Sequence, residues 1–359
     1  MSPAARIPVV ASDAHLAHDG LVELLAGREV PCFESPARAI AIRRALEEWG
    51  NCRFVEPTEY GIDPITAVHD LELVDVLEHV WEDAMAAGRD PDRCLIPDTF
   101  RLDAYVGPMS LPELPAARHD RLGAYCFDTA TPIVGGTYGA ARASVDIALT
   151  ALEVVVGGAP MAYALCRPPG HHAGRNLFGG YCYFNNAAIS AQRLVSLGAE
   201  RVAILDLDFH HGNGTQQIFW ERSEVLYVSL HGDPRAAYPY YSGSAAETGA
   251  GRGAGATRNL PLPSGTGGDR YLDALADALA AVGDFASDAP LVVSIGFDTF
   301  TADPICDFAL ETDDYRRIGA EIARLGRAVV AIQEGGYAVE AIGVNAVSFI
   351  NGLAAAGAI

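Results

Sequence analysis

The sequence DLDFHH at positions 206–211 places two carboxylates and two imidazoles close together, directly after an apolar run that begins at Val202. Alternate side chains of an extended segment share one face, so Asp206, Asp208 and His210 are expected to point together. Burying two acids beside imidazoles is costly without a cation, which disfavours a cluster that only caps a helix. Such donors suit zinc or a similar divalent ion, and a catalytic site uses three protein ligands while leaving a position for water.

The expected third ligand is Asp298, which follows the apolar run that starts at Leu291. Taken alone, an aspartate in this position would more often cap a helix than bind a metal. Its assignment therefore depends on Asp208 and His210, since ligands of α/β sheets collect outside the carboxyl ends of the strands.

Two other strand ends carry groups suited to proton transfer and charge stabilisation. His171 and His172 lie in the sequence RPPGHHA, and paired imidazoles can take a proton from a metal-bound water and return it to a leaving amine. Tyr337 lies in the sequence EGGY, where its hydroxyl can stabilise an oxyanion, although such a tyrosine taken alone would more often be a packing residue. Together these groups predict the hydrolysis of an amide.

The elements that must position these groups alternate between strands and helices. Such a rhythm is typical of a parallel sheet covered by helices on both faces, and we expect one domain over residues 1–359. Buried strands are predicted at Met161–Cys166, Val202–Leu207, Val225–Ser229, Leu291–Ile295 and Val329–Gln333. Helices are predicted at Ala37–Trp49, His69–Ala87, Asn186–Leu197, Tyr271–Val282 and Asp313–Leu325, and the N-terminal part is expected to be less regular.

Composition limits the class of partner. The net charge of −21 repels nucleic acids and anionic membranes and modestly attracts cationic solutes. The seven cysteines include no CxxC pair, which favours a reducing cytoplasm. The apolar runs are too short to span a bilayer, so we expect no membrane association.

The chain resembles the histone deacetylase superfamily, in particular its acetylpolyamine amidohydrolase and class II-like bacterial branch. The matching sequences, in order, are RPPGHHA, FGGYCYFNNAAI, AILDLDFHHGNGTQ, VSLHGDP, GFDTFTADP and EGGY, with a fainter match at FESPARA, residues 33–39. The resemblance implies an arginase-like open α/β fold with a mainly parallel sheet of roughly eight strands. It also implies one zinc ion per chain, bound by Asp208, His210 and Asp298.

The resemblance further implies roles for individual residues. His172 would be the general base and acid, His171 its electrostatic partner, and Tyr337 the residue that polarises the carbonyl. Asp206 would hydrogen-bond to His171, and Asn213 would orient His172. A structural potassium ion would lie near Asp206, Asp208, His210, Ser229 and Leu230, with a second one near the carbonyls of Phe219 and Val225.

The same resemblance indicates the substrate. Gly180, Tyr181 and Tyr238 would line a tunnel for the acylated amine, which the resemblance indicates is a small N-acetylated polyamine or related cationic amine. The relatives' acidic residues correspond here to His119 and Ala130, so Glu113, Asp120 or Asp128 would have to replace them. The segment Leu111–Ala130 would form a homodimer interface.

Three other functions remain open at this level. The first is a broader acyl-lysine protein or peptide deacetylase, which would need an open rim around the site. The second is a catalytically silent acyl-binding module, although the expected ligands, both histidines and Tyr337 are intact. The third is a dinuclear manganese hydrolase of the arginase type, which is disfavoured because ligands for a second metal are missing.

Overall fold

The computed structural model describes residues 6–102, 114–285 and 288–356. Its main sheet has eight strands in the order β4-β1-β5-β10-β9-β6-β7-β8, and every neighbouring pair runs parallel. The strands are β1 (Ile7–Val10), β4 (Cys52–Val55), β5 (Met161–Ala164), β6 (Val202–Asp206), β7 (Val225–Gly232), β8 (Thr257–Leu262), β9 (Leu291–Ile295) and β10 (Val329–Gln333). The predicted mainly parallel sheet of about eight strands is confirmed.

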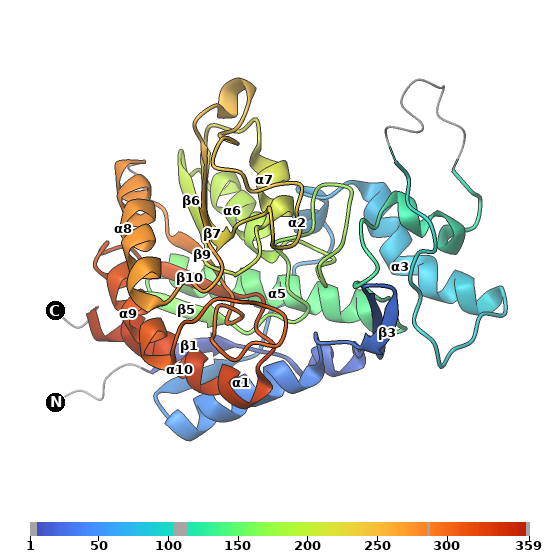
Figure 1. The fold of residues 1–359 in the computed structure, drawn as a ribbon, viewed down its shortest axis with the longest axis horizontal. Helices are drawn as coiled ribbons and strands as arrows, with labels where there is room; N and C mark the ends of the chain where they lie inside the picture. The colour runs from blue at the N-terminus through green and yellow to red at the C-terminus, as the bar shows by residue number, and fades with distance from the viewer. Residues whose placement is uncertain (1–5, 103–113, 286–287, 357–359) are drawn as a thin grey trace.

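Helices cover both faces of this sheet (Figure 1). On one face, Val9 of β1 belongs to the same core as residues of α1 (Pro36–Trp49), α8 (Gly268–Asp284), α9 (Thr312–Ala323) and α10 (Val339–Ala356). On the other face, the adjacent Val10 belongs to a core shared with α3 (Leu71–Ala86), α5 (Thr137–Val156), α6 (Asn186–Ser196) and α7 (Asn213–Phe219). Because both faces are buried, the central strands are nearly continuous apolar runs.

The five predicted strands all start where expected, but the prediction of an irregular N-terminal part is wrong in one respect. The strands β1 and β4 join the main sheet, with Val9 opposite Phe54 in a parallel register. Each strand has only four residues, too few for a clear apolar periodicity. The long helix α5 was also missed, because its sequence is apolar or small around most of its circumference.

A second, two-stranded sheet lies outside the main one. It is an antiparallel hairpin of β2 (Val22–Leu25) and β3 (Arg28–Pro31). Figure 1 shows β3 near α3, on the side of the molecule away from α8 and α9. Two hydrogen bonds attach the hairpin to the loop after Cys126: Leu24 N–H donates to the Thr129 carbonyl (3.1 Å), and the Thr129 hydroxyl donates to the Leu24 carbonyl (2.9 Å).

Candidate active site

The predicted site residues follow four strands that are neighbours in the sheet. The order β5-β10-β9-β6 brings together the loops that carry His171, Tyr337, Asp298 and Asp208. Because these strands are parallel, their carboxyl ends lie at one edge of the sheet, where α/β proteins bind ligands. Residues separated by more than a hundred positions in the sequence therefore converge.

Asp208, His210 and Asp298 lie in direct contact with one another. His210 Nδ1 is 3.1 Å from an oxygen of Asp298 and 3.3 Å from an oxygen of Asp208, and both carboxylates are fully buried. Backbone N–H groups hold them, since Gly335 donates to Asp208 (2.8 Å) and Phe209 donates to Asp298 (2.9 Å). The structure thus brings together the three residues that were predicted from different strand ends.

The electrostatics of this group fit a bound divalent cation. Burial and the neighbouring Asp208 raise the pKa of Asp298 to about 7, whereas His171 and His210 lower the pKa of Asp208 against the effect of burial. Two carboxylates therefore share the single imidazole of His210, and their mutual repulsion raises the pKa of Asp298, a cost that a bound cation would remove. Two carboxylates and one imidazole are also a donor set that zinc accepts, so the residues present fit that metal.

The carboxylates of Asp208 and Asp298 leave no room for a side chain at Gly296 or Gly335, which follow the neighbouring strands β9 and β10. A Cβ at Gly335 would lie 2.5 Å from an oxygen of Asp298 and 2.7 Å from an oxygen of Asp208. A Cβ at Gly296 would lie 2.2 Å from Asp208. Any side chain at either position would push the carboxylates out of their present arrangement.

The two adjacent histidines occupy different electrostatic environments. His171 Nδ1 is 3.1 Å from Asp206, and the carboxylates of Asp206 and Asp208 raise the pKa of His171 to about 10 against the effect of burial. His172 Nδ1 is 2.7 Å from the amide oxygen of Asn213, and burial together with the nearby His171 and His210 holds the pKa of His172 well below its usual range. His171 is therefore a cation, while His172 is neutral and can accept a proton.

Tyr337 is buried, lines the same cavity as His172 and is held by two contacts. Its backbone N–H donates to Asp303 (2.7 Å), and the Arg38 guanidinium lies 4.8 Å from the centre of its ring. Burial raises the pKa of Tyr337 well above its usual range, so the phenol keeps its proton and can donate a hydrogen bond.

The predicted catalytic groups border a cavity of about 790 Å³. His172, His210 and Tyr337 line it, together with Gly180, Tyr181 and Tyr238, the predicted residues of the tunnel wall. The Tyr238 ring lies 5.1 Å from that of His172. Gly180 packs so closely that a Cβ there would lie 2.2 Å from the His172 ring.

Of the acidic residues considered for a cationic substrate, Asp128 lines the cavity. Asp120 is 54% exposed and lies outside the cavity wall, next to His119. Glu113, with the start of the segment Leu111–Ala130, lies outside the described residues.

The predicted potassium-binding residues lie on two adjacent strands, β6 and β7, or in the loop that follows β6. Asp206 at the end of β6 is paired in register with Ser229 of β7, and Leu230 follows Ser229. The Ser229 hydroxyl contacts His231 Nδ1 at 2.7 Å. Phe219 ends α7 and Val225 begins β7, so both positions of the second predicted site flank one short connection.

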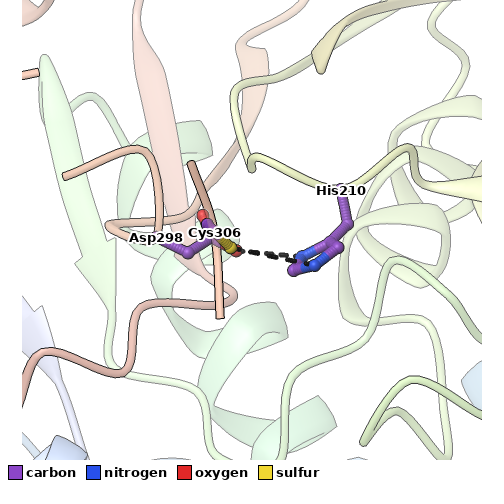
Figure 2. Close-up of side chains that lie close together, drawn as sticks. All are labelled: His210, Asp298 and Cys306. Carbon is purple, nitrogen blue, oxygen red and sulfur yellow. Dashed lines mark hydrogen bonds and ion pairs between the residues drawn. The ribbon is translucent and has the colours of Figure 1, made fainter. Parts of the chain in front are cut away.

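The structure adds a thiol to the group around His210 that the sequence analysis did not single out. Cys306 Sγ lies 3.8 Å from His210 Nε2, and possible ligand atoms of His210, Asp298 and Cys306 all lie within 4.8 Å of one another. Figure 2 shows Asp298 and Cys306 side by side, facing the His210 ring. Burial raises the pKa of the Cys306 thiol well above its usual range. The sequence feature that could have identified Cys306 is its position in GFDTFTADPIC, eight residues after the predicted ligand Asp298.

Three buried charges that support the site were also missed. Glu334 accepts hydrogen bonds from the backbone of Gly170 (2.7 Å) and His171 (3.1 Å), so it holds the loop that carries the paired histidines. Arg38 donates to the carbonyl of Glu334 (2.6 Å) and to Glu34 (2.7 Å). Both Glu34 and Arg38 belong to the FESPARA sequence, and the sequence alone does not indicate which groups these two side chains contact.

Comparison with known proteins identifies the family to which the chain belongs. An α/β sheet whose strand ends gather two carboxylates and an imidazole beside paired histidines is suited to the metal-dependent hydrolysis of an amide. The family model described as "Histone deacetylase domain" matches residues 32–353. The chain belongs to the histone deacetylase family and is a hydrolase; zinc dependence is typical of that family.

Several similar proteins carry more specific names. The chain is 47% identical to acetylpolyamine amidohydrolase 1 of Pseudomonas aeruginosa over 345 residues, which cover 96% of this chain and 97% of that protein. It is 42% identical to the acetylpolyamine amidohydrolase of Mycoplana ramosa over 346 residues, covering 96% and 99% of the two chains. The crystal structure of acetylpolyamine aminohydrolase from Burkholderia pseudomallei superimposes with a TM-score of 0.90 at 38% identity, covering 97% of this chain and 99% of the other.

Proposed function

We propose that this protein removes the acetyl group from small N-acetylated polyamines or related cationic amines. The observation that carries the proposal is the charge of the cavity wall. Its charged residues apart from histidine are the acids Glu23, Asp128, Asp233 and Asp307, and no lysine or arginine of the described chain lines it. An acidic, partly enclosed wall attracts an ammonium group, and the similar proteins named above are acetylpolyamine amidohydrolases.

The proposal includes one zinc ion held by Asp208, His210 and Asp298. Zinc supplies an activated water and polarises the amide carbonyl when it is bound there. His172 is neutral and accepts the proton from the attacking water, then returns it to the departing amine. Tyr337 donates a hydrogen bond to the carbonyl oxygen as negative charge develops on it, and the His171 cation, held by Asp206, favours that charge. Asn213 orients His172 for both proton transfers.

Four further expectations belong to the same proposal. Potassium bound near Asp206 and Ser229 would stabilise the strand end that carries the ligands. The chain would form one domain. It would also act as a homodimer through the segment Leu111–Ala130, and a molar-mass measurement by light scattering tests the dimer. A reducing cytoplasm agrees with the seven free cysteines, all of which lie in the described residues. No helix in the described ranges is long and apolar enough to cross a membrane.

A deacylation panel tests the proposed function. The purified, zinc-loaded protein is assayed with N-acetylputrescine, N-acetylcadaverine, N-acetylspermidine and an acetyl-lysine peptide. We expect the highest kcat/KM with one of the acetylated polyamines. A higher kcat/KM with the peptide would favour the broader acyl-lysine deacetylase, and no turnover of any substrate would reject both functions.

A further inference from the structure

Asp303 is a buried acid that joins the loops of two predicted site residues, and the mechanism above does not use it. It lies between β9 and α9, five residues after Asp298, and is 8% exposed. Both of its carboxylate oxygens accept hydrogen bonds from backbone N–H groups: Oδ2 from Tyr337 (2.7 Å) and Oδ1 from Ile305 (3.1 Å). The contact with Tyr337 connects the loop after β9 to the loop after β10, across 34 positions of the sequence.

The loop that carries Asp303 is held by contacts of its own. Thr301 N–H donates to the Leu310 carbonyl (2.9 Å), and Leu310 N–H donates to the Thr299 carbonyl (3.2 Å). The two ends of the loop lie at the predicted metal site, since Asp298 and Cys306 both face the His210 ring (Figure 2). Asp303 is therefore an anchor whose position is fixed relative to the metal ligands.

The segment that carries Tyr337 depends on contacts with other segments for its conformation. Two glycines precede Tyr337, and the second, Gly336, has φ of 116°, which residues with a side chain rarely adopt. Phe297 N–H donates to the carbonyl of the first glycine (3.0 Å), and Arg38 donates to the carbonyl of Gly336 (2.5 Å). The contact with Asp303 is the one of these three that holds the backbone of Tyr337 itself.

A backbone anchor is suited to the role proposed for Tyr337. The hydroxyl of Tyr337 must stay free to donate to the carbonyl oxygen of the substrate, so a protein group that held it directly would compete with that role. The backbone can be held without this competition. The position of such a donor matters, because a misplacement of about 1 Å can cost about 100-fold in rate.

The two N–H donors explain why the anchor is an acid. A carboxylate offers an acceptor oxygen on each side, whereas an amide offers one oxygen and one NH₂ group. In Asp303→Asn the side chain would accept from only one of Tyr337 and Ile305 and would turn its NH₂ group towards the other N–H. The substitution keeps the shape of the side chain and loses one of its two backbone contacts.

We infer that Asp303 is a positioning residue, which fixes the backbone of Tyr337 against the loop of the predicted metal ligands and thereby sets where the Tyr337 hydroxyl meets the substrate carbonyl. The inference rests on the proposed function and concerns the same site. Asp303 does not line the cavity and acts through Tyr337. Its effect on turnover therefore requires the hydroxyl of Tyr337.

A double-mutant cycle tests this dependence. Asp303→Ala and Asp303→Asn are each made in the unaltered protein and in Tyr337→Phe, and kcat and KM are measured with the substrate of the deacylation panel that is cleaved fastest. In the unaltered background, Asp303→Ala should lower kcat at least about tenfold and change KM less than about threefold, because an interaction of the transition state is weakened. Asp303→Asn should lose less, since one acceptor oxygen remains. In Tyr337→Phe both substitutions should change kcat less than about threefold, because no hydroxyl is left to misplace.

The matched control is Asp146→Asn. Asp146 is also 8% exposed and accepts a hydrogen bond from a distant backbone N–H, that of Tyr60 at 3.0 Å, but it lies on α5 outside the cavity wall. This variant should leave kcat and KM unchanged. Metal analysis should find the same zinc content in the Asp303 variants as in the unaltered protein, because the three predicted ligands are intact. If Asp303→Ala folds poorly, the cycle is completed with Asp303→Asn.

Three results would overturn the inference. Equal losses of kcat in both backgrounds would show that Asp303 does not act through Tyr337, unchanged kinetics would show that it positions nothing, and a loss of zinc would place its effect at the metal ligands. Failure of the proposed function looks different. If the unaltered protein prefers the acetyl-lysine peptide, the proposed substrate class is wrong, and the cycle run with that peptide still decides the role of Asp303. No turnover of any substrate rejects both.

Discussion

His172 Nδ1 lies 2.7 Å from the side-chain oxygen of Asn213, an acceptor that carries no charge. The adjacent His171 instead faces the carboxylate of Asp206. Burial and the nearby His171 and His210 lower the pKa of His172, and the amide oxygen of Asn213 opposes this far less than a carboxylate would. The carboxylates of Asp206 and Asp208 instead raise the pKa of His171. Because one histidine is paired with an acid and the other with an amide, the two adjacent rings are suited to different roles: His171 to carrying a positive charge and His172 to accepting a proton.

Replacing the neutral acceptor should shift the pH dependence of the reaction. Asn213→Asp raises the pKa of His172, so His172 holds a proton over a wider range and cannot act as a base there. The acidic limb of the kcat/KM profile should therefore move to higher pH by about one unit. Asn51→Asp, at an exposed position before β4, should leave the profile unchanged. An unshifted acidic limb in Asn213→Asp would remove His172 from the role of the base.

His210→Ala should lose zinc. The variant leaves two carboxylates without their shared imidazole, so the site has two of its three ligands. Metal analysis after dialysis should find well under one zinc per chain, while His79→Ala, at a half-exposed histidine of α3, keeps the full content. Retained stoichiometric zinc in His210→Ala would show that His210 is not a ligand.

Tyr337→Phe should reduce kcat by about 100-fold or more, because a buried donor to the developing oxyanion is removed. The fold should persist, since the backbone contact of Tyr337 with Asp303 does not involve the hydroxyl. Tyr241→Phe, at a residue that is 97% exposed, is the control. Steady-state kinetics with matched circular dichroism spectra measure the effect, and unchanged turnover would exclude the oxyanion role.

Glu34→Ala should destabilise the protein by about 3–5 kcal/mol, because it leaves two buried arginines without their partner. Glu34 contacts Arg38 at 2.7 Å and Arg167 at 2.8 Å, and all three side chains are almost fully buried. Denaturant unfolding measures the change. Glu47→Ala, whose partner Arg43 is on the surface, should change the free energy of unfolding little. Comparable stability of both variants would contradict a structural role for the buried network.

The sequence was sufficient to predict the site where reactive side chains lie within a few residues of the end of a buried strand. The apolar runs before Asp208 and Asp298 marked buried strands, and the parallel arrangement made their ends neighbours. It failed where a contact joins distant segments without a local pattern. The contact of Arg38 with Glu334 spans 296 positions, and that of Tyr181 with Glu23 spans 158, so neither could be inferred from spacing.

The hairpin β2–β3 borders the cavity from outside the main sheet. It carries Glu23 but takes no part in the eight-stranded sheet that holds Asp208, His210 and Asp298. Substitutions in this hairpin can therefore reshape the cavity wall while the strand ends that carry the three predicted ligands keep their geometry. The shape of the cavity and the stability of the main sheet can in this way change independently of each other.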